Sequence, residues 1–74
     1  MKIDLHFIIN KILESNDLKS ISALDNSLNL RDDLGFDSLM LAELTVEIED
    51  KFNIDIFEDG VVFTISDILN KLNG

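Results

Sequence analysis

The chain has 74 residues, of which 46% are hydrophobic, and it carries a formal net charge of −9 at pH 7. This length predicts a single domain over residues 1–74, and the hydrophobic share excludes a disordered chain. The charge argues against nucleic acid as a partner, because its phosphates would be repelled, and it favours proteins with basic surfaces. The alternative is that the acidity only keeps a small monomer soluble.

The residue types that are missing narrow the class further. The sequence has no cysteine, so it can form neither a disulfide nor a thiolate metal site, and we expect a reducing, cytoplasmic setting. No apolar run reaches about 18 residues, and no basic and then apolar leader opens the sequence. Neither a membrane span nor a signal peptide is therefore expected.

In chain order, the first predicted element is a helix from Lys2 to Glu14. Its apolar residues recur at the three- and four-residue spacing of a buried helical stripe, which Ile3 and Phe7 are expected to widen. The stripe itself consists of Leu5, Ile8, Ile9, Ile12 and Leu13. Residues 15–37 form a connection that is long for so small a domain, and we interpret it as a loop held to the core by apolar anchors.

The second predicted helix runs from Ser38 to Phe52, with Asp37 as its N-cap. At about 100° per residue, a single arc collects the side chains expected to be buried. These are Leu41, Leu44, Thr45, Ile48 and Phe52. A second arc, expected to be exposed, holds Leu39, Ala42 and Val46, and Met40 adds a further apolar side chain near the helix start.

Acids surround that second arc, and no basic residue lies between positions 37 and 50. The acids are Asp37, Glu43, Glu47, Glu49 and Asp50. Together with the apolar arc they predict a surface patch that binds a basic partner. Single exposed apolar residues are also common in soluble proteins, so the arc by itself has an ordinary structural explanation.

The last third of the chain begins with a break, where Asn53 ends the helix and Gly60 allows a turn. The alternation of Ile54 and Ile56 is too short for a strand and has no partner, so no sheet is expected. Thr64 resembles the N-cap of a third helix, with an acid three residues later as in a capping box. The capping acid and the apolar face of this helix are Asp67, Ile65, Ile68, Leu69 and Leu72.

A short helical turn before this helix is expected to close the core through Phe57, Val61, Val62 and Phe63. The elements together predict an all-α fold. It is a small four-helix bundle of three main helices plus one short helix, with a long first loop.

Ser38 is the candidate functional residue, because it stands alone between a glycine turn and a helix. A nucleophilic serine needs a general base, but the only histidine, His6, lies in the first helix, and no lysine is close in sequence. Residues 25–36 fail as an EF-hand, since Leu30 replaces the turn glycine and Phe36 the bidentate glutamate. No glycine-rich phosphate loop or zinc ligand set is found, which leaves only a weak, incidental site for a divalent ion among the acids as an open alternative. Two interpretations of Ser38 remain: other proteins modify it, or it only helps to start the helix.

The stretch "DLGFDSLMLAELTVEIEDKFNIDI" resembles the acyl carrier protein and peptidyl carrier protein family, and the likeness extends over nearly the whole chain. The resemblance implies a carrier that is not an enzyme. It makes Ser38 the attachment point of 4′-phosphopantetheine, delivered from coenzyme A by a separate phosphopantetheinyl transferase. The thiol of this arm would hold an acyl or aminoacyl group as a thioester between loading and synthase enzymes. Asp37 matches the acid that in the family lies close to the modification chemistry.

The resemblance also implies a face of the second helix that is presented to basic partner enzymes. Its residues would be Leu39, Met40, Glu43, Val46, Glu47 and Asp50. The alternative from the residues alone is a small acidic module that binds a basic partner helix through Leu39 and Val46 and has no prosthetic group.

Three departures from the family pattern bear on the pathway. Phe57 stands where the family often has proline. The stretch from Ile56 to Thr64 is about two residues shorter than in fatty-acid carriers. Met40 occupies a position that is often acidic in fatty-acid carriers. These departures favour a stand-alone carrier for a specialised polyketide, nonribosomal peptide or related thiotemplate pathway over fatty-acid synthesis. A D-alanyl carrier is a further option.

Overall fold

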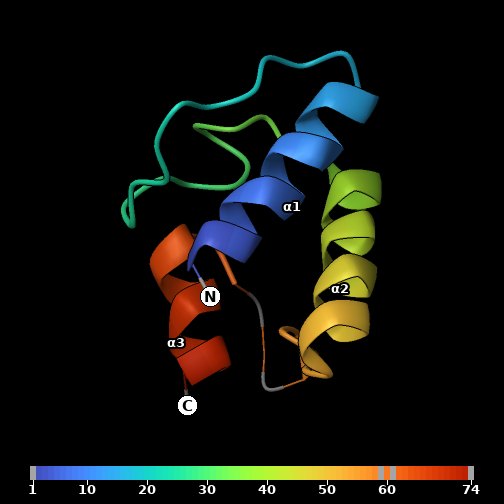
Figure 1. The fold of residues 1–74 in the computed structure, drawn as a ribbon, viewed down its shortest axis with the longest axis vertical. Helices are drawn as coiled ribbons and strands as arrows, with labels where there is room; N and C mark the ends of the chain where they lie inside the picture. The colour runs from blue at the N-terminus through green and yellow to red at the C-terminus, as the bar shows by residue number, and fades with distance from the viewer. Residues whose placement is uncertain (1, 59, 61, 74) are drawn as a thin grey trace.

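The computed structural model describes residues 2–58, 60 and 62–73, and within them the chain forms three helices and no strand. The helices are α1 (Lys2–Ser15), α2 (Ser38–Phe52) and α3 (Ile65–Asn73). Figure 1 shows α1 and α2 side by side and running in opposite directions, with α3 beside the start of α1. None of the helices in the described part has the length and apolar character needed to cross a bilayer.

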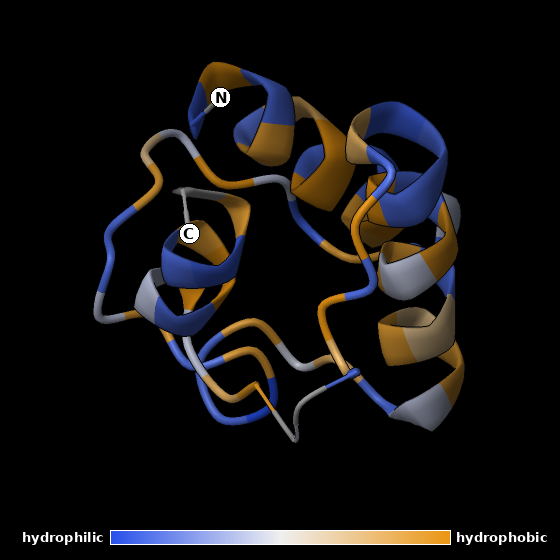
Figure 2. Cartoon of the chain, turned by 90° about the horizontal axis from the view of Figure 1, so that it is seen from below, coloured by the Kyte–Doolittle hydropathy of each residue, from blue (hydrophilic) through white to orange (hydrophobic). Residues whose placement is uncertain are grey.

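The stripe predicted for α1 is confirmed, because its five apolar residues are all buried. Figure 2 shows the hydrophobic and hydrophilic stretches that alternate along the helices. Ile3 and Phe7 do not widen the stripe, since they are 85% and 72% exposed. At about 100° per residue they fall on the side of α1 opposite to Leu5 and Ile9, so that expectation was wrong for a geometric reason.

The long first loop is held to α1 by polar as well as apolar contacts. His6 Nε2 lies 2.8 Å from the carbonyl oxygen of Ile21, and the Asn10 side chain both donates to that oxygen at 3.0 Å and accepts from the Ile21 N–H at 2.8 Å. The predicted apolar anchors of the loop are confirmed except for Leu18, which is 39% exposed. Those that are buried or partly buried are Ile21, Leu24, Leu28, Leu30, Leu34 and Phe36. The sole histidine thus has a structural role in fixing the loop.

Backbone hydrogen bonds also connect the second half of the loop to the start of α3. The Leu30 N–H donates to Phe63 O at 2.8 Å, and the Ile65 N–H donates to Leu28 O at 3.0 Å. Within the described residues the only β pairing is an isolated bridge between Asn29 and Thr64. This bridge fixes the backbone two residues before Arg31.

The buried face of α2 differs from the predicted one. Met40, Leu44 and Ile48 are buried, whereas Leu41 and Phe52 are only partly so. The face is therefore centred on Leu44, about 50° from the predicted centre near Ile48. Met40 is 2% exposed, so its placement on the outer surface was wrong.

The position of α1 explains this rotation. Lys11 Nζ lies 3.1 Å from Glu47 Oε1, and Lys51 Nζ lies 3.7 Å from Asp4 Oδ1, so two ion pairs connect α1 to α2. By the helical period, Glu47 and Lys51 lie on the same side of α2 as Met40. Packing of α1 against this side covers Met40, an arrangement that the sequence of α2 alone does not reveal.

The segment between α2 and α3 contains a turn at residues 56–58 and buries Ile56 and Val62. The predicted short fourth helix is not confirmed. Phe57 belongs to the turn, Val62 and Phe63 have no helical conformation, and Val61 lies outside the described residues. In the described part of the chain, three helices, the long first loop and a non-helical connection therefore enclose the core.

The predicted capping box of α3 is confirmed. Asp67 Oδ2 accepts from the N–H groups of Phe63 at 2.9 Å and Thr64 at 3.1 Å, and Thr64 Oγ1 accepts from the Asp67 N–H at 3.2 Å. These bonds, first the one from Phe63, lower the pKa of the Asp67 carboxyl below its ordinary value. The ionised side chain thus stabilises the start of α3.

Asp67→Ala is expected to reduce the free energy of unfolding by about 1 kcal/mol at pH 7. Since the folded-state pKa is lowered, the contribution is present above the unfolded value of about 3.9 and is lost as pH falls through the folded value. The difference between variant and wild type should therefore shrink toward pH 2, as measured by urea denaturation at several pH values. Asp32→Ala is the control, because Asp32 is exposed and no side-chain bond of it is found in the described part. An undiminished difference at pH 2 would contradict this assignment.

Candidate functional site

Ser38 is the first residue of α2, and its side chain is exposed. The preceding Asp37 has an extended backbone, and its Oδ1 accepts from the Met40 N–H at 2.9 Å. Its carbonyl oxygen accepts from the Leu41 N–H at 2.9 Å. Asp37 is therefore the N-cap, as predicted, and the Ser38 hydroxyl is not needed to start the helix.

The turn before α2 presents Ser38 to solvent. Gly35 has φ +76°, in the left-handed region that favours glycine, and its N–H donates to Arg31 O at 3.1 Å. Leu34 and Phe36 on either side are 7% and 3% exposed. Burial of these two side chains anchors the turn to the core, and the serine that follows lies at the surface.

The surroundings of Ser38 contain a cation and no base in contact. Arg31 Nη2 donates to Ser38 Oγ at 3.4 Å, the only hydrogen bond of this hydroxyl among the described residues. A guanidinium offers only N–H donors and has no acceptor for the serine proton. The histidine ring is engaged with Ile21 in the first loop. This geometry suits a hydroxyl that reacts when a second protein supplies the base.

Two acids of the region tested as a calcium loop, Asp25 and Asp33, serve as local caps. Asp25 Oδ1 accepts from the N–H and the hydroxyl of Ser27 at 2.9 and 2.8 Å, and these bonds lower the pKa of Asp25. Asp33 Oδ2 accepts from the Asn29 N–H at 2.7 Å. Within the described residues, no three side chains of His, Cys, Asp or Glu lie together so that they could hold a metal ion.

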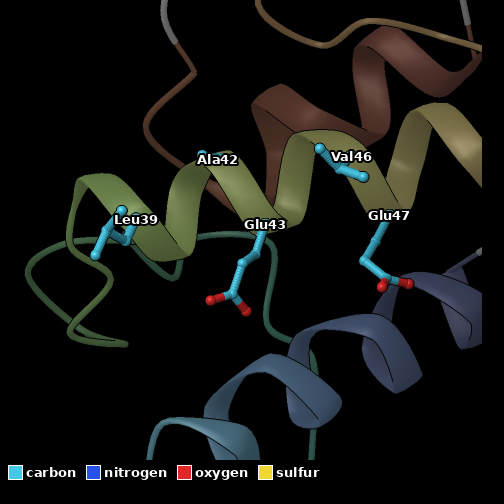
Figure 3. Close-up of a pocket in the computed structure, with 5 residues that line it drawn as sticks. All are labelled: Leu39, Ala42, Glu43, Val46 and Glu47. Atoms are coloured by element: carbon cyan, nitrogen blue, oxygen red, sulfur yellow. The ribbon is translucent and has the colours of Figure 1, made fainter.

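The outer face of α2 carries a shallow apolar groove next to Ser38. Figure 3 shows its five lining residues, with Glu43 and Glu47 pointing from α2 toward α1. The lining residues are Leu39, Ala42, Glu43, Val46 and Glu47. Leu39 and Val46 are 75% and 64% exposed. A second depression continues the acidic surface toward the end of α2 and is lined by Val46, Glu49, Asp50 and Asn53.

Most residues predicted for the partner surface therefore lie together on the outside of α2. They are Leu39, Glu43, Val46, Glu47 and Asp50, whereas Met40 faces the core. Glu47 is only half exposed because it is paired with Lys11. Sequence reasoning missed Arg31, although it is the only arginine in the chain. Its separation of seven residues from Ser38 gives no signal, because a turn and not a helix brings the two together.

The comparisons with known proteins agree with one another. A family model described as "Phosphopantetheine attachment site" matches residues 6–71. An acyl carrier protein of Rickettsia bellii (strain OSU 85-389) is 32% identical over 64 residues, which cover 84% of this chain and 79% of that protein. An acyl carrier protein of Exiguobacterium sp. (strain ATCC BAA-1283 / AT1b) is 34% identical over 53 residues, covering 69% of this chain and 67% of that protein. No solved structure gives a significant match.

Proposed function

The chain belongs to the family of acyl carrier proteins with a phosphopantetheine attachment site, and on this basis we propose that Ser38 carries the arm. Family membership implies a covalently attached 4′-phosphopantetheine. The observation that supports Ser38 is its exposed hydroxyl at the start of α2, with a guanidinium and no base in contact. When bound, the arm supplies a thiol that holds an acyl or aminoacyl group as a thioester.

The residues around Ser38 fit this group. The hydroxyl is open to solvent on one side, so a long substituent meets no steric obstacle. The first turn of α2 offers backbone N–H groups and the positive end of the helix dipole to a phosphate. In this proposal the protein has no catalytic role of its own, because the transferase supplies the base for attachment and the synthase enzymes supply that for thioester transfer.

The partner surface of this carrier would be the outer face of α2. Leu39 and Val46 provide apolar contact, and Glu43, Glu47 and Asp50 provide charge for a partner with a basic surface. The transferase and the loading or synthase enzymes would share this surface, since all of them must reach the same serine. In this proposal the carrier is a single monomeric domain, and it would meet these partners in the cytoplasm.

The pathway that we propose is a specialised thiotemplate route to a polyketide, a nonribosomal peptide or a related product. It is supported by Phe57 in place of proline, by the irregular short segment after α2 and by Met40 in place of an acid. The burial of Met40 bears on this point, because an acid at that position would have to enter the core between α1 and α2.

The attachment site can be tested by mass spectrometry after incubation with a broad-specificity transferase and coenzyme A. We expect the intact chain to gain one phosphopantetheine. Trypsin would release residues 32–51, in which Ser38 is the only serine. The gain should therefore appear on this peptide. Failure of several transferases to modify the wild type, or an arm found on another peptide, would contradict the proposal.

The role of charge can be tested with Glu43→Lys. At low salt we expect kcat/KM for loading by a transferase with a basic surface to fall about 10-fold, because encounter is steered by opposite charge. The difference should narrow at high salt, where surface charges are screened. Glu58→Lys makes the same change in charge at an exposed residue beyond the far end of α2. An equal loss in both variants would assign the effect to net charge instead of to the α2 surface.

A further inference from the structure

Arg31 is the one arginine of this chain, and its side chain reaches the hydroxyl of Ser38 at 3.4 Å. The neighbouring carboxylates of Asp33 and Asp37 accept from backbone N–H groups, at 2.7 and 2.9 Å. No ion pair of Arg31 is found among the described residues. The guanidinium is therefore placed beside Ser38 with hydrogen-bonding capacity to spare.

The backbone of Arg31 is fixed although its side chain is exposed. Its N–H donates to Asn29 Oδ1 at 2.9 Å, and its carbonyl oxygen accepts from the Gly35 N–H at 3.1 Å. The preceding Leu30 is 1% exposed and bonded through its N–H to Phe63 O. These contacts fix the backbone from which the Arg31 side chain extends toward Ser38. Little further ordering is therefore needed for the guanidinium to bind a group attached to Ser38.

We propose that Arg31 binds the phosphodiester that links the arm to Ser38, an inference that rests on the proposed function. Once Oγ is esterified, the negative charge lies on the two non-bridging phosphate oxygens, which are two bonds beyond Oγ through the phosphorus atom. A guanidinium that already contacts Oγ needs only a small side-chain rotation to reach both oxygens. The planar fork of arginine matches two such oxygens, which gives a charge-assisted, bidentate contact.

This contact would also set the direction in which the arm leaves α2. Arg31 lines a small cavity of about 80 Å³ together with Leu41, Val62 and Phe63, among others. By the helical period, Leu41 lies on the side of α2 roughly opposite to Leu39 and Val46. A phosphate held by Arg31 therefore directs the start of the arm toward Leu41 and leaves the apolar groove free for a partner.

The test uses NMR of the intact protein before and after loading with the unacylated arm. Because the chain has one arginine, its side-chain Nε–Hε gives a single resonance that needs no assignment by mutation. We expect this resonance to shift downfield on loading and its exchange with water to slow several-fold. The methyl resonances of Leu41 should shift as well, and those of Val46 should not.

Arg31→Gln supplies the second measurement, through the ³¹P resonance of the loaded arm. We expect this resonance to differ between Arg31→Gln and wild type, and to be unchanged in Lys2→Gln. Lys2 begins α1, at the end of the helix pair opposite to Ser38, and its loss changes the net charge equally (Figure 1). Intact mass verifies loading in every sample.

The outcomes separate the two proposals. A protein that gains the arm but shows the same Nε–Hε resonance before and after loading overturns the role of Arg31 and leaves the carrier function intact. The same holds if Arg31→Gln and Lys2→Gln give identical ³¹P resonances. A protein that gains no arm overturns the carrier function and this inference together.

Discussion

Leu44→Ala is expected to lower the free energy of unfolding by about 3 kcal/mol, because it leaves a cavity at the centre of the buried face of α2. Leu44 is 0% exposed and belongs to the cluster in which α1 and α2 meet. A domain of this size has a total stability of only about 4 to 11 kcal/mol, so the loss is a large share of it. Urea denaturation followed by circular dichroism measures the change.

Leu39→Ala is the matched control, since it makes the same chemical change in the same helix at a residue that is 75% exposed. We expect its effect on stability to stay within about 0.5 kcal/mol. Equal losses in the two variants would mean that Leu39 is also part of the core. That result would remove the apolar groove from the proposed partner surface.

Features that depend on neighbouring residues could be predicted from the sequence. The bounds of α2, Ser38–Phe52, were predicted in full, because Asp37 and Asn53 provide a cap at each end. The capping box of Thr64 and Asp67 was predicted for the same reason, since its hydrogen bonds connect residues three apart. Such signals require no knowledge of the rest of the fold.

Features that depend on contacts between elements could not be predicted in this way. The period of α2 identified two apolar arcs, but which side of the helix is covered depends on where α1 lies. For this reason Met40 was assigned to the surface and Leu41 to the buried face, while the structure has Met40 buried and Leu41 only partly buried, in the lining of a small cavity. The contact of Arg31 with Ser38 likewise depends on the turn at Gly35.

The separation of the two faces has a consequence for the proposed carrier. Residues that hold α2 in the fold, such as Leu44, are distinct from those that would meet partners, such as Leu39 and Val46. Asp37 caps the helix while the adjacent Ser38 stays exposed. The N-cap and the proposed attachment site are thus different residues, so the serine could be modified without loss of the cap.

Ser38→Ala is therefore expected to abolish gain of the phosphopantetheine arm and to leave the fold intact. Loading should fall from one arm per chain to none, because alanine has no oxygen to attack the donor. Stability should change by no more than about 0.5 kcal/mol, since the side chain is exposed and Asp37 supplies the cap. Intact mass after incubation with transferase and coenzyme A gives the first quantity, and urea denaturation gives the second.

Ser22→Ala is the control for this substitution, because Ser22 is an exposed serine of the first loop. It should be loaded as completely as the wild type. The view that Ser38 only helps to start α2 makes the opposite pair of predictions, a marked loss of stability and unchanged loading. An arm that still appears on Ser38→Ala would show that another residue is the attachment site. It would also overturn the proposed role of Arg31, whose guanidinium contacts Ser38 Oγ.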